Sequence, residues 1–447
     1  MKKNYLFCFL LFLVACSKNA PATPVDDDDA VVTENPAPTA ETPNILFIIA
    51  DDMGIDASPR YGIGNNLPAM PTLTSWMDMG IRFTNVWTNP VCSPTRASIL
   101  TGKYGYRTGV LNPEDAGVLS ADETILHRLL NESTTNPYAT SIIGKWHLSG
   151  RNVPDRPIEM GADYYAGILN GGVPSYTSWP LTQNGNTSTN SEYVTTKLTD
   201  LAIDWIGDQD QPWLCWLAYN APHTPFHLPP QALHSQGVLP EDEASIDANP
   251  LPYYLAMIES LDTEMGRLVS TLSSTTLANT LIVFLGDNGS PREVIQPPYS
   301  STQGKGSLYQ GGIHVPMVIT GFGVERKGEI EDALITSVDL FSTFLNVAGQ
   351  TIQESHDSQT FLPLLTSAGA ATRNFNYTEY LTDRASQSGY TLQNITHKLI
   401  VFDNGNEALY SLENDPYENE NLLDASLTSV AQNAYDALTT EAARIRQ

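Results

Sequence analysis

Several side chains that can bind a cation or carry a proton directly follow apolar runs of the sequence. They are Asp51 and Asp52, Lys145 and His147, His223, and Asp287 and Asn288. Carboxylate and amide oxygens suit Ca²⁺ or Mg²⁺, whereas Zn²⁺ normally recruits His or Cys. Either acidic pair alone is equally compatible with a helix cap or a turn. Together they predict one oxygen-ligated divalent cation with lysine and histidine side chains beside it.

The runs that precede these residues have the composition of strands buried on both faces of a sheet. They lie at residues 44–50, 139–148 (whose end includes Lys145 and His147), 212–219 and 279–286, with a further candidate at 313–320. Helical patterns lie between them at 67–80, 120–133, 192–209 and 253–274. This alternation predicts an α/β fold with a mostly parallel, doubly wound sheet flanked by helices. Ligands bind such sheets at the carboxyl ends of the strands, so we expect one convergent site.

The overall charge limits the classes of ligand. The chain has 447 residues, 41% of them hydrophobic, and a formal net charge of −27. A strongly acidic chain is not expected to bind nucleic acid, because that function normally needs a basic surface. An anionic substrate must therefore be captured by a local group of cations rather than by bulk attraction.

The N-terminus has the features of an export signal. Two lysines precede a short apolar run that ends in Leu13-Val14-Ala15-Cys16, which resembles a bacterial lipobox. We therefore expect a lipoprotein signal peptide over 1–15, acylation of Cys16, and a Pro-, Ala- and Asp-rich disordered tether over 16–42. The expected product is an exported bacterial lipoprotein, anchored by its lipid and facing the periplasm or the cell exterior. An ordinary signal peptide with a chance cysteine is the alternative.

Only Cys92 and Cys215 remain beyond the signal. A disulfide between them is one interpretation in an oxidising compartment. Cys215, however, lies in the apolar run 212–219, where a lone cysteine behaves as a small hydrophobic residue. Cys92 then needs its own explanation.

The segment around Cys92 supplies that explanation. Cys92-Ser93-Pro94-Thr95-Arg96, continued by ASILTG, resembles the maturation motif of the formylglycine-dependent (type I) sulfatases of the alkaline phosphatase superfamily. In that family the cysteine is oxidised to an aldehyde, formylglycine. PNILFIIADDMG, GKWHL, NAPHTPFHLPP, GDNG, KGSLYQGGIHVPMVI and EALYSLENDPYENENL resemble further family elements in the same order. The resemblance implies a catalytic domain over 43–350 and a small C-terminal subdomain of antiparallel strands and a helix over 351–447.

The resemblance also implies a ligand set for the cation. The metal ligands would be Asp51, Asp52, Asp287, Asn288 and the formylglycine formed from Cys92. The cation would be Ca²⁺, or alternatively Mg²⁺. It would lower the pKa of a hydroxyl of the hydrated aldehyde and so provide a nucleophile at neutral pH.

The remaining roles concern the sulfate and the leaving group. Arg96 would position the hydrated aldehyde, Lys145 and Lys305 would bind the sulfate oxygens, and His147 would contact the second hydroxyl. His223 would bind the substrate and protonate the leaving alcohol as a general acid.

Two positions depart from the family pattern, and other histidines carry weaker signals. Gln310 stands where Glu is common and His314 where Arg is common, which puts the fine positioning near Lys305 in doubt. His227 is either a substrate contact or a loop histidine, and His127 is expected to be structural. His234, His356 and His397 give no usable signal.

The predicted function is the hydrolysis of sulfate esters with release of inorganic sulfate, in the degradation of sulfated polysaccharide. The expected partners are a sulfated oligosaccharide or polysaccharide fragment, a formylglycine-generating maturation enzyme, and a membrane through the lipid anchor. One alternative is a phosphate or phosphonate monoester hydrolase of the same superfamily, which usually relies on histidine metal ligands. The other is a non-catalytic surface lipoprotein that binds sulfated glycans. Such a protein would be expected to lose Cys92, Lys145 or His223, and all three are present.

Overall fold

The computed structural model describes residues 42–114, 117–150, 153–350, 356–370 and 373–447. The expected signal peptide, Cys16 and all but the last residue of the expected tether lie outside these ranges. Within them, none of the helices combines the length and the apolar character needed to cross a bilayer.

A ten-stranded sheet forms the centre of the fold, in the order β11-β2-β10-β9-β1-β8-β4-β5-β6-β7. Its five middle strands β9, β1, β8, β4 and β5 run parallel. They span Thr280–Gly286, Asn44–Ala50, Trp213–Ala218, Ala139–Lys145 and Tyr164–Ile168. The outer strands are β10 (Met317–Gly321), β2 (Ile81–Phe83), β11 (Glu329–Glu331), β6 (Trp179–Gln183) and β7 (Asn186–Asn190). The predicted mostly parallel sheet is confirmed.

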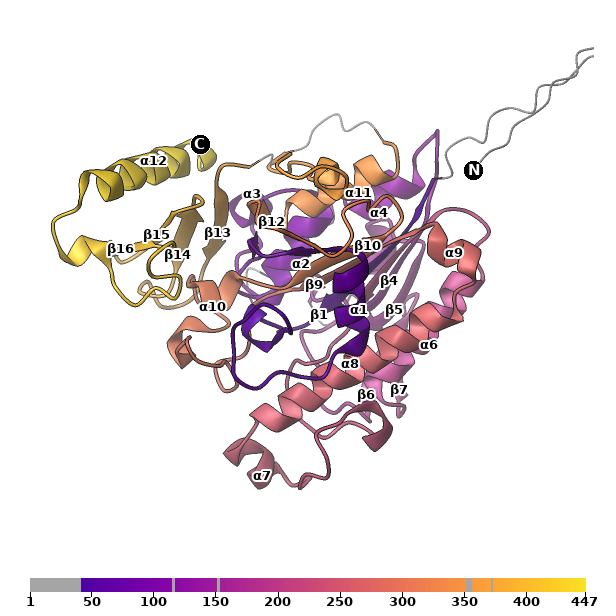
Figure 1. The fold of residues 1–447 in the computed structure, drawn as a ribbon. Coiled ribbons are helices and arrows are strands. Elements are labelled where there is room, and N and C mark those ends of the chain that lie inside the picture. The colour runs from indigo at the N-terminus through magenta and orange to yellow at the C-terminus, as the bar shows by residue number, and fades with distance from the viewer. Residues whose placement is uncertain (1–41, 115–116, 151–152, 351–355, 371–372) are drawn as a thin grey trace, which may run out of the picture. The chain divides into compact units, whose positions relative to one another are not determined.

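Helices cover both faces of this sheet (Figure 1). Alternate residues of β1 enter two separate cores, as the period of two along a strand requires. Phe47 packs in the core beneath α2 (Cys92–Thr101), α4 (Leu126–Asn131) and α11 (Asp339–Val347). Ile48 packs in the core beneath α1 (Pro71–Met79), α6 (Val194–Gly207) and α8 (Leu251–Thr271). With both faces covered, every residue of β1 is buried, which explains its continuous apolar sequence.

The predicted elements match the observed ones closely, with one local difference. The four predicted strands and four predicted helices are all present, although α4 is shorter than its pattern. The candidate strand at 313–320 forms only from Met317, as β10, and it pairs antiparallel with β9. Residues Gln310–Ile313 instead form the short helix α10, and Pro316, which has no amide N–H to donate, directly precedes β10.

A second, four-stranded antiparallel sheet follows near the C-terminus. It consists of β13 (Asn376–Tyr380), β14 (Gly389–Gln393), β15 (His397–Phe402) and β16 (Glu407–Ser411). The C-terminal helix α12 (Ser429–Ile445) packs its apolar side on this sheet, with Leu438 and Ala442 beside Leu399. Figure 1 shows this helix over the sheet in yellow. The predicted C-terminal subdomain of antiparallel strands and a helix is confirmed.

The remaining helices and strands are short. They are α3 (Gly105–Thr108), α5 (Arg156–Glu159), α7 (Glu243–Ala248), α9 (Ser274–Ala278), β3 (Val86–Trp87) and β12 (Ile335–Thr336).

Candidate active site

The sequence-predicted residues meet at the carboxyl edge of the parallel strands. Asp51 follows β1 and Asp287 follows β9, whose last residues Ala50 and Gly286 are in register. Lys145 is the last residue of β4, two strands away across β8. Because neighbouring parallel strands end together, three charged side chains from distant parts of the sequence face one another here. All three are fully buried.

Four oxygen-bearing side chains form the acidic end of this site. Asp287 Oδ1 accepts the backbone N–H of Asp52 at 2.9 Å, and Asn288 Nδ2 donates to Asp52 Oδ1 at 2.8 Å. Asp51 Oδ1 and Asn288 Oδ1 are buried and have no hydrogen-bond partner in the described part of the chain. Buried oxygens without a partner are costly, and a hard cation is the partner that such a set prefers. Asp51, Asp52, Asp287 and Asn288 therefore fit one divalent cation.

Burial and neighbouring charges act on the two adjacent carboxylates in different ways. Burial raises the pKa of Asp51 well above its usual value, and Lys145 offsets only part of this effect. Burial also acts to raise the pKa of Asp52, but Lys305 and His223 outweigh it and the pKa is lowered. Asp52 has a φ of 71°, a left-handed conformation that is uncommon outside glycine and that clusters at functional sites.

Three cations surround the acidic end. Lys145 Nζ lies 2.6 Å from Asp51 Oδ2, and Lys305 Nζ lies 2.6 Å from the Asp52 carboxylate. Arg96 donates from Nη2 to Asp287 at 2.7 Å and from Nη1 to the backbone oxygen of Lys145 at 2.7 Å. Burial acts to lower the pKa of Lys305, but Asp52 outweighs it and raises the pKa, so this side chain remains charged. The site thus combines an oxygen-only acidic set with fixed positive charges.

Cys92 is the first residue of α2 and is almost fully buried. Val91, the N-cap residue of α2, makes no side-chain cap hydrogen bond. Because α2 begins at Cys92, the positive end of the helix dipole lies at this residue and favours negative charge there. The Cys92 thiol is 3.2 Å from His147 Nδ1. Cys92 and Cys215 are both free, so the interpretation of a disulfide between them is wrong.

The two predicted site histidines contact different members of the cluster, His147 the Cys92 thiol and His223 the Asp52 carboxylate. Burial, with a smaller contribution from Lys145, lowers the pKa of His147 well below its usual value. His223 Nδ1 is 2.8 Å from the carbonyl oxygen of Thr224, which makes Nδ1 the protonated nitrogen of the neutral ring. His223 Nε2 then faces the site, 3.8 Å from Asp52 Oδ2, and burial lowers the pKa of the ring to about 3. Asp51, Asp52 and His223 also form a group whose ligand atoms all lie within 4.8 Å of one another.

The other histidines and the two departures from the family pattern make contacts outside this cluster. Both ring nitrogens of His227 are engaged, with Tyr193 Oη at 3.1 Å and the carbonyl oxygen of Pro225 at 3.1 Å. His127 is buried 3.3 Å from the Ser141 carbonyl oxygen, as expected of a structural residue. Gln310 hydrogen-bonds with the side chains of Trp87 and Gln393, and His314 contacts the carbonyl oxygen of Thr84. His234, His356 and His397, for which the sequence predicted no role, also lie outside this cluster.

A groove with a volume of about 800 Å³ opens beside Lys305. One wall is formed by Val91, Arg292 and Gly306, and the other by Tyr380 at the end of β13 and the following turn with Arg384. Apart from Lys305, the sequence analysis missed the residues of both walls, because no local motif marks them. The only available signal was that the chain keeps two arginines in otherwise acidic or polar loops.

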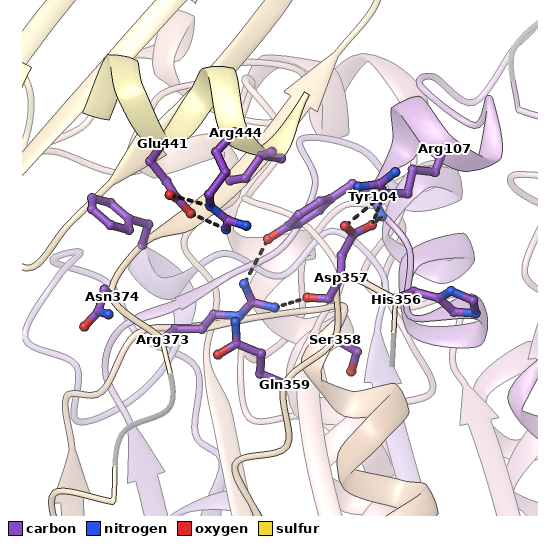
Figure 2. Close-up of a pocket in the computed structure, with 12 residues that line it drawn as sticks. Tyr104, Arg107, His356, Asp357, Ser358, Gln359, Arg373, Asn374, Glu441 and Arg444 are labelled. Atoms are coloured by element: carbon purple, nitrogen blue, oxygen red, sulfur yellow. Dashed lines mark hydrogen bonds and ion pairs between the residues drawn. The ribbon is translucent and has the colours of Figure 1, made fainter. Parts of the chain in front are cut away.

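A separate cavity of about 430 Å³ lies between α3, α12 and the segments 356–359 and 373–375 (Figure 2). The arginines that line it are all paired: Arg107 with Asp357, Arg373 with Asp339, and Arg444 with Glu441. Because these charges are neutralised within the chain, the cavity is a junction between the subdomain and the main sheet rather than a candidate catalytic site.

Comparison with known proteins assigns the chain to a family. Residues 43–350 match the sulfatase family model, and residues 303–444 match the model described as the C-terminal part of N-sulphoglucosamine sulphohydrolase. The chain therefore belongs to the sulfatase family, within the alkaline phosphatase-like superfamily.

Curated relatives are consistent with this assignment. The chain is 30% identical over 382 residues to an uncharacterized sulfatase, YdeN, of Escherichia coli (strain K12), which covers 73% of this chain and 66% of that protein. It is 25% identical to an arylsulfatase of Klebsiella aerogenes, over 78% of this chain and 95% of that protein. In the first of these comparisons the chain spans slightly less than two thirds of its relative's length.

Solved structures share the fold. Ps i-CgsB, determined in complex with k-i-k-neocarrahexaose, superposes with a TM-score of 0.75 at 24% identity, over 90% of this chain and 92% of that chain. BT4656, determined in complex with its substrate D-glucosamine-2-N,6-O-disulfate, gives a TM-score of 0.75 at 21% identity, over 91% and 98% of the two chains.

Proposed function

We propose that this protein hydrolyses sulfate monoesters of a saccharide and releases inorganic sulfate, using a formylglycine made from Cys92 and one divalent cation. The observation that carries this proposal is the position of Cys92. It lies at the positive end of α2, 3.2 Å from His147, in a site that also holds Arg96 and two lysines. A cysteine needed only for packing would not require these charged neighbours.

Ca²⁺ or Mg²⁺, held by Asp51, Asp52, Asp287 and Asn288, would lower the pKa of the nucleophile, and the hydrated aldehyde at position 92 would supply the attacking hydroxyl. Cationic side chains of the protein supply the remaining electrostatic stabilisation. Lys145 and Lys305 bind the oxygens of the sulfate, where negative charge is spread in the transition state. Arg96 keeps Asp287 and the end of β4 in place through its two hydrogen bonds.

The two histidines transfer protons at different points of the reaction, His147 at the nucleophile and His223 at the leaving alcohol. His147 Nδ1 accepts a proton from the side chain at position 92. His223 Nε2 delivers a proton to the leaving alcohol, while its Nδ1–H stays bound to the Thr224 carbonyl. Burial lowers the pKa of His223 to about 3 in the free protein, so this step requires that the negative charge of a bound sulfate ester raise the pKa of the ring.

The substrate is a sulfated saccharide, encountered during the degradation of sulfated polysaccharide. Two structural neighbours were determined in complex with saccharides, a neocarrahexaose and a disulfated glucosamine. In a chain of net charge −27, the basic groups at this site capture one anionic group locally. A formylglycine-generating enzyme is the partner that must act on Cys92 beforehand.

The test is sulfate release by protein produced with the maturation enzyme. The panel contains sulfated oligosaccharides, an aryl sulfate, choline sulfate and phosphate monoesters. We expect sulfate release from at least one saccharide and from the aryl sulfate, and none from either by Cys92→Ala. Turnover of phosphate esters alone would support the phosphatase alternative, and binding of glycans without turnover would support the glycan-binding lipoprotein.

The segment before residue 42 supports a proposal about location. Leu13-Val14-Ala15-Cys16 resembles a lipobox, so the protein is an exported lipoprotein anchored through acylated Cys16. Cell fractionation and mass spectrometry of the native N-terminus test this proposal. Cys16→Ala should move the protein from the membrane fraction to the soluble fraction or block processing, and a native N-terminus elsewhere without lipid would contradict it.

A further inference from the structure

Two arginines beside the active site have no carboxylate partner. Acidic residues outnumber basic ones by 50 to 23 in this chain. Apart from Arg82, Arg292 and Arg384, every arginine in the described ranges has a carboxylate within ion-pair distance. Arg82 instead lies over the ring of Tyr61, with 5.2 Å to its centroid. Arg292 and Arg384 both line the groove beside Lys305. The unpaired guanidiniums thus gather where the proposed substrate leaves the sulfate site.

Arg292 is held in a fixed position without being neutralised. Its Nε donates to the backbone oxygen of Lys305 at 3.1 Å, and its Nη2 donates to that of Gly306 at 3.1 Å. Neutral carbonyls order the guanidinium but leave its positive charge available, and Nη1 has no partner in the described part of the chain. Lys305 Nζ is paired with the Asp52 carboxylate, so Arg292 is the positive charge without a carboxylate partner on the groove side of Lys305.

Tyr380 from the C-terminal subdomain faces Arg292 across Gly306. A Cβ built on Gly306 would lie 3.4 Å from Tyr380 Oη and 3.6 Å from Arg292 Nη2, so the two polar groups converge there. Burial raises the pKa of Tyr380, although Arg292 and Lys305 act in the opposite direction. The phenol therefore stays neutral and can both donate to and accept from a sugar hydroxyl.

Arg384 approaches the same groove from the turn between β13 and β14. Its backbone N–H donates to Thr382 Oγ1 at 2.8 Å, and its carbonyl accepts the N–H of Gln387 at 2.8 Å. These bonds fix the turn, while the guanidinium has no carboxylate partner in the described residues. Lys305 is paired with Asp52, so Arg292 and Arg384 are the groove cations that have no carboxylate partner in the described residues of this strongly acidic protein.

We propose that this groove binds the part of the substrate beyond the cleaved ester, and that this part carries a second oxyanion, a sulfate or a carboxylate. Arg292 and Arg384 bind the second oxyanion, and Tyr380 hydrogen-bonds the sugar between it and the sulfate site. The preferred substrate is therefore a saccharide with at least two anionic groups. The inference rests on the proposed sulfatase function and assigns its specificity to residues on both sides of the groove.

The test compares Arg292→Gln, Arg384→Gln and the control Arg82→Gln with the parent protein. Each is assayed on an aryl sulfate and on three matched disaccharides: monosulfated, disulfated, and sulfated with a uronate. A guanidinium hydrogen bond to an anion contributes about 1.5–3 kcal/mol, or roughly 10- to 100-fold in kcat/KM. We expect the parent to prefer a two-anion disaccharide over the monosulfated one by at least ~10-fold. In Arg292→Gln and in Arg384→Gln, kcat/KM on the two-anion disaccharide should fall at least ~10-fold more than kcat/KM on the aryl sulfate, mainly because KM rises. Arg82→Gln should match the parent.

Each outcome is informative because the aryl sulfate lacks the second anion. Equal losses on all substrates would show that Arg292 only positions Lys305, and would overturn the inference. It is also overturned if the parent cleaves the aryl sulfate but two-anion disaccharides are neither cleaved nor competitive inhibitors. The uronate and disulfate arms distinguish which oxyanion is bound. Failure of the parent on every sulfate ester, aryl sulfate included, would instead overturn the proposed function.

Discussion

The Cys92 thiol lies 3.2 Å from His147 Nδ1, at the point where the N-terminus of α2 meets the carboxyl end of β4. His147 follows β4 with a φ of 56°, an uncommon backbone conformation for a non-glycine residue. Ser93 Oγ donates to the His147 carbonyl at 2.8 Å and helps to hold the turn. A cysteine and a histidine from distant parts of the sequence are thus placed so that a proton can pass between them.

This relationship predicts the behaviour of Cys92 variants. Protein made with the maturation enzyme should carry formylglycine at position 92, and the peptide should be lighter than the thiol form and react with aldehyde probes. Cys92→Ala should lose all measurable sulfate release, because no nucleophile remains at the head of α2. Cys92→Ser should give at most a trapped sulfate adduct, because it lacks a second hydroxyl. Full activity of Cys92→Ala would contradict the mechanism.

The unpaired buried oxygens predict a bound metal. Elemental analysis should find Ca²⁺, or alternatively Mg²⁺, near one per chain. Asn288→Ala removes one candidate ligand oxygen without breaking an ion pair. The variant should therefore bind less metal, and adding Ca²⁺ should raise its thermal stability less than that of the parent. A ligand at 100 times its Kd stabilises a fold by about 2.7 kcal/mol. Asp78→Asn, at an exposed site, is the control. Two zinc ions per chain would favour the phosphatase alternative.

His223 should matter most for poor leaving groups. His223→Gln removes the proton donor, so kcat/KM on saccharide sulfates should fall about 10²- to 10⁴-fold. The phenol released from an aryl sulfate is acidic and needs little protonation, so kcat/KM on this substrate should fall far less. His227→Gln is the matched control, since both its ring nitrogens are already engaged in the chain. A loss for His223→Gln that is the same for all leaving groups would show that this residue binds substrate but is not the acid.

Much of the fold and of the acidic cluster could be predicted, because both follow from local sequence. Buried parallel strands have continuous apolar sequences, and the residues that end them must meet at one edge, as Asp51, Lys145 and Asp287 do. The groove could not be predicted in this way. Tyr380 and Arg292 approach each other only because the second sheet packs beside the loop that holds Gly306. The candidate strand at 313–320 was wrong in its first half, because α10 ends at Ile313 and Pro316, which has no amide N–H, directly precedes the start of β10 at Met317.

His127 predicts how stability depends on pH. This histidine of α4 is fully buried, and burial lowers its pKa to about 3. In the unfolded chain its pKa is about 6.5, so between these values the unfolded state binds a proton that the folded state does not. The free energy of unfolding should therefore fall as pH drops below about 6.5, by at most about 1.4 kcal/mol per pH unit from this residue. Above that pH the contribution is constant.

The measurement is urea unfolding of the parent and of His127→Phe between pH 7.5 and pH 5. The variant loses the contact with the Ser141 carbonyl and should be less stable at pH 7.5. Its stability should nevertheless fall less steeply with acid than that of the parent. Asp56, whose pKa burial raises to about 6, changes stability in the opposite sense in this range, so the difference between the two proteins isolates His127. His234→Gln, at a half-buried loop position, controls for losing a histidine. Parallel curves for His127→Phe and the parent would show that His127 is protonated to the same extent in both states.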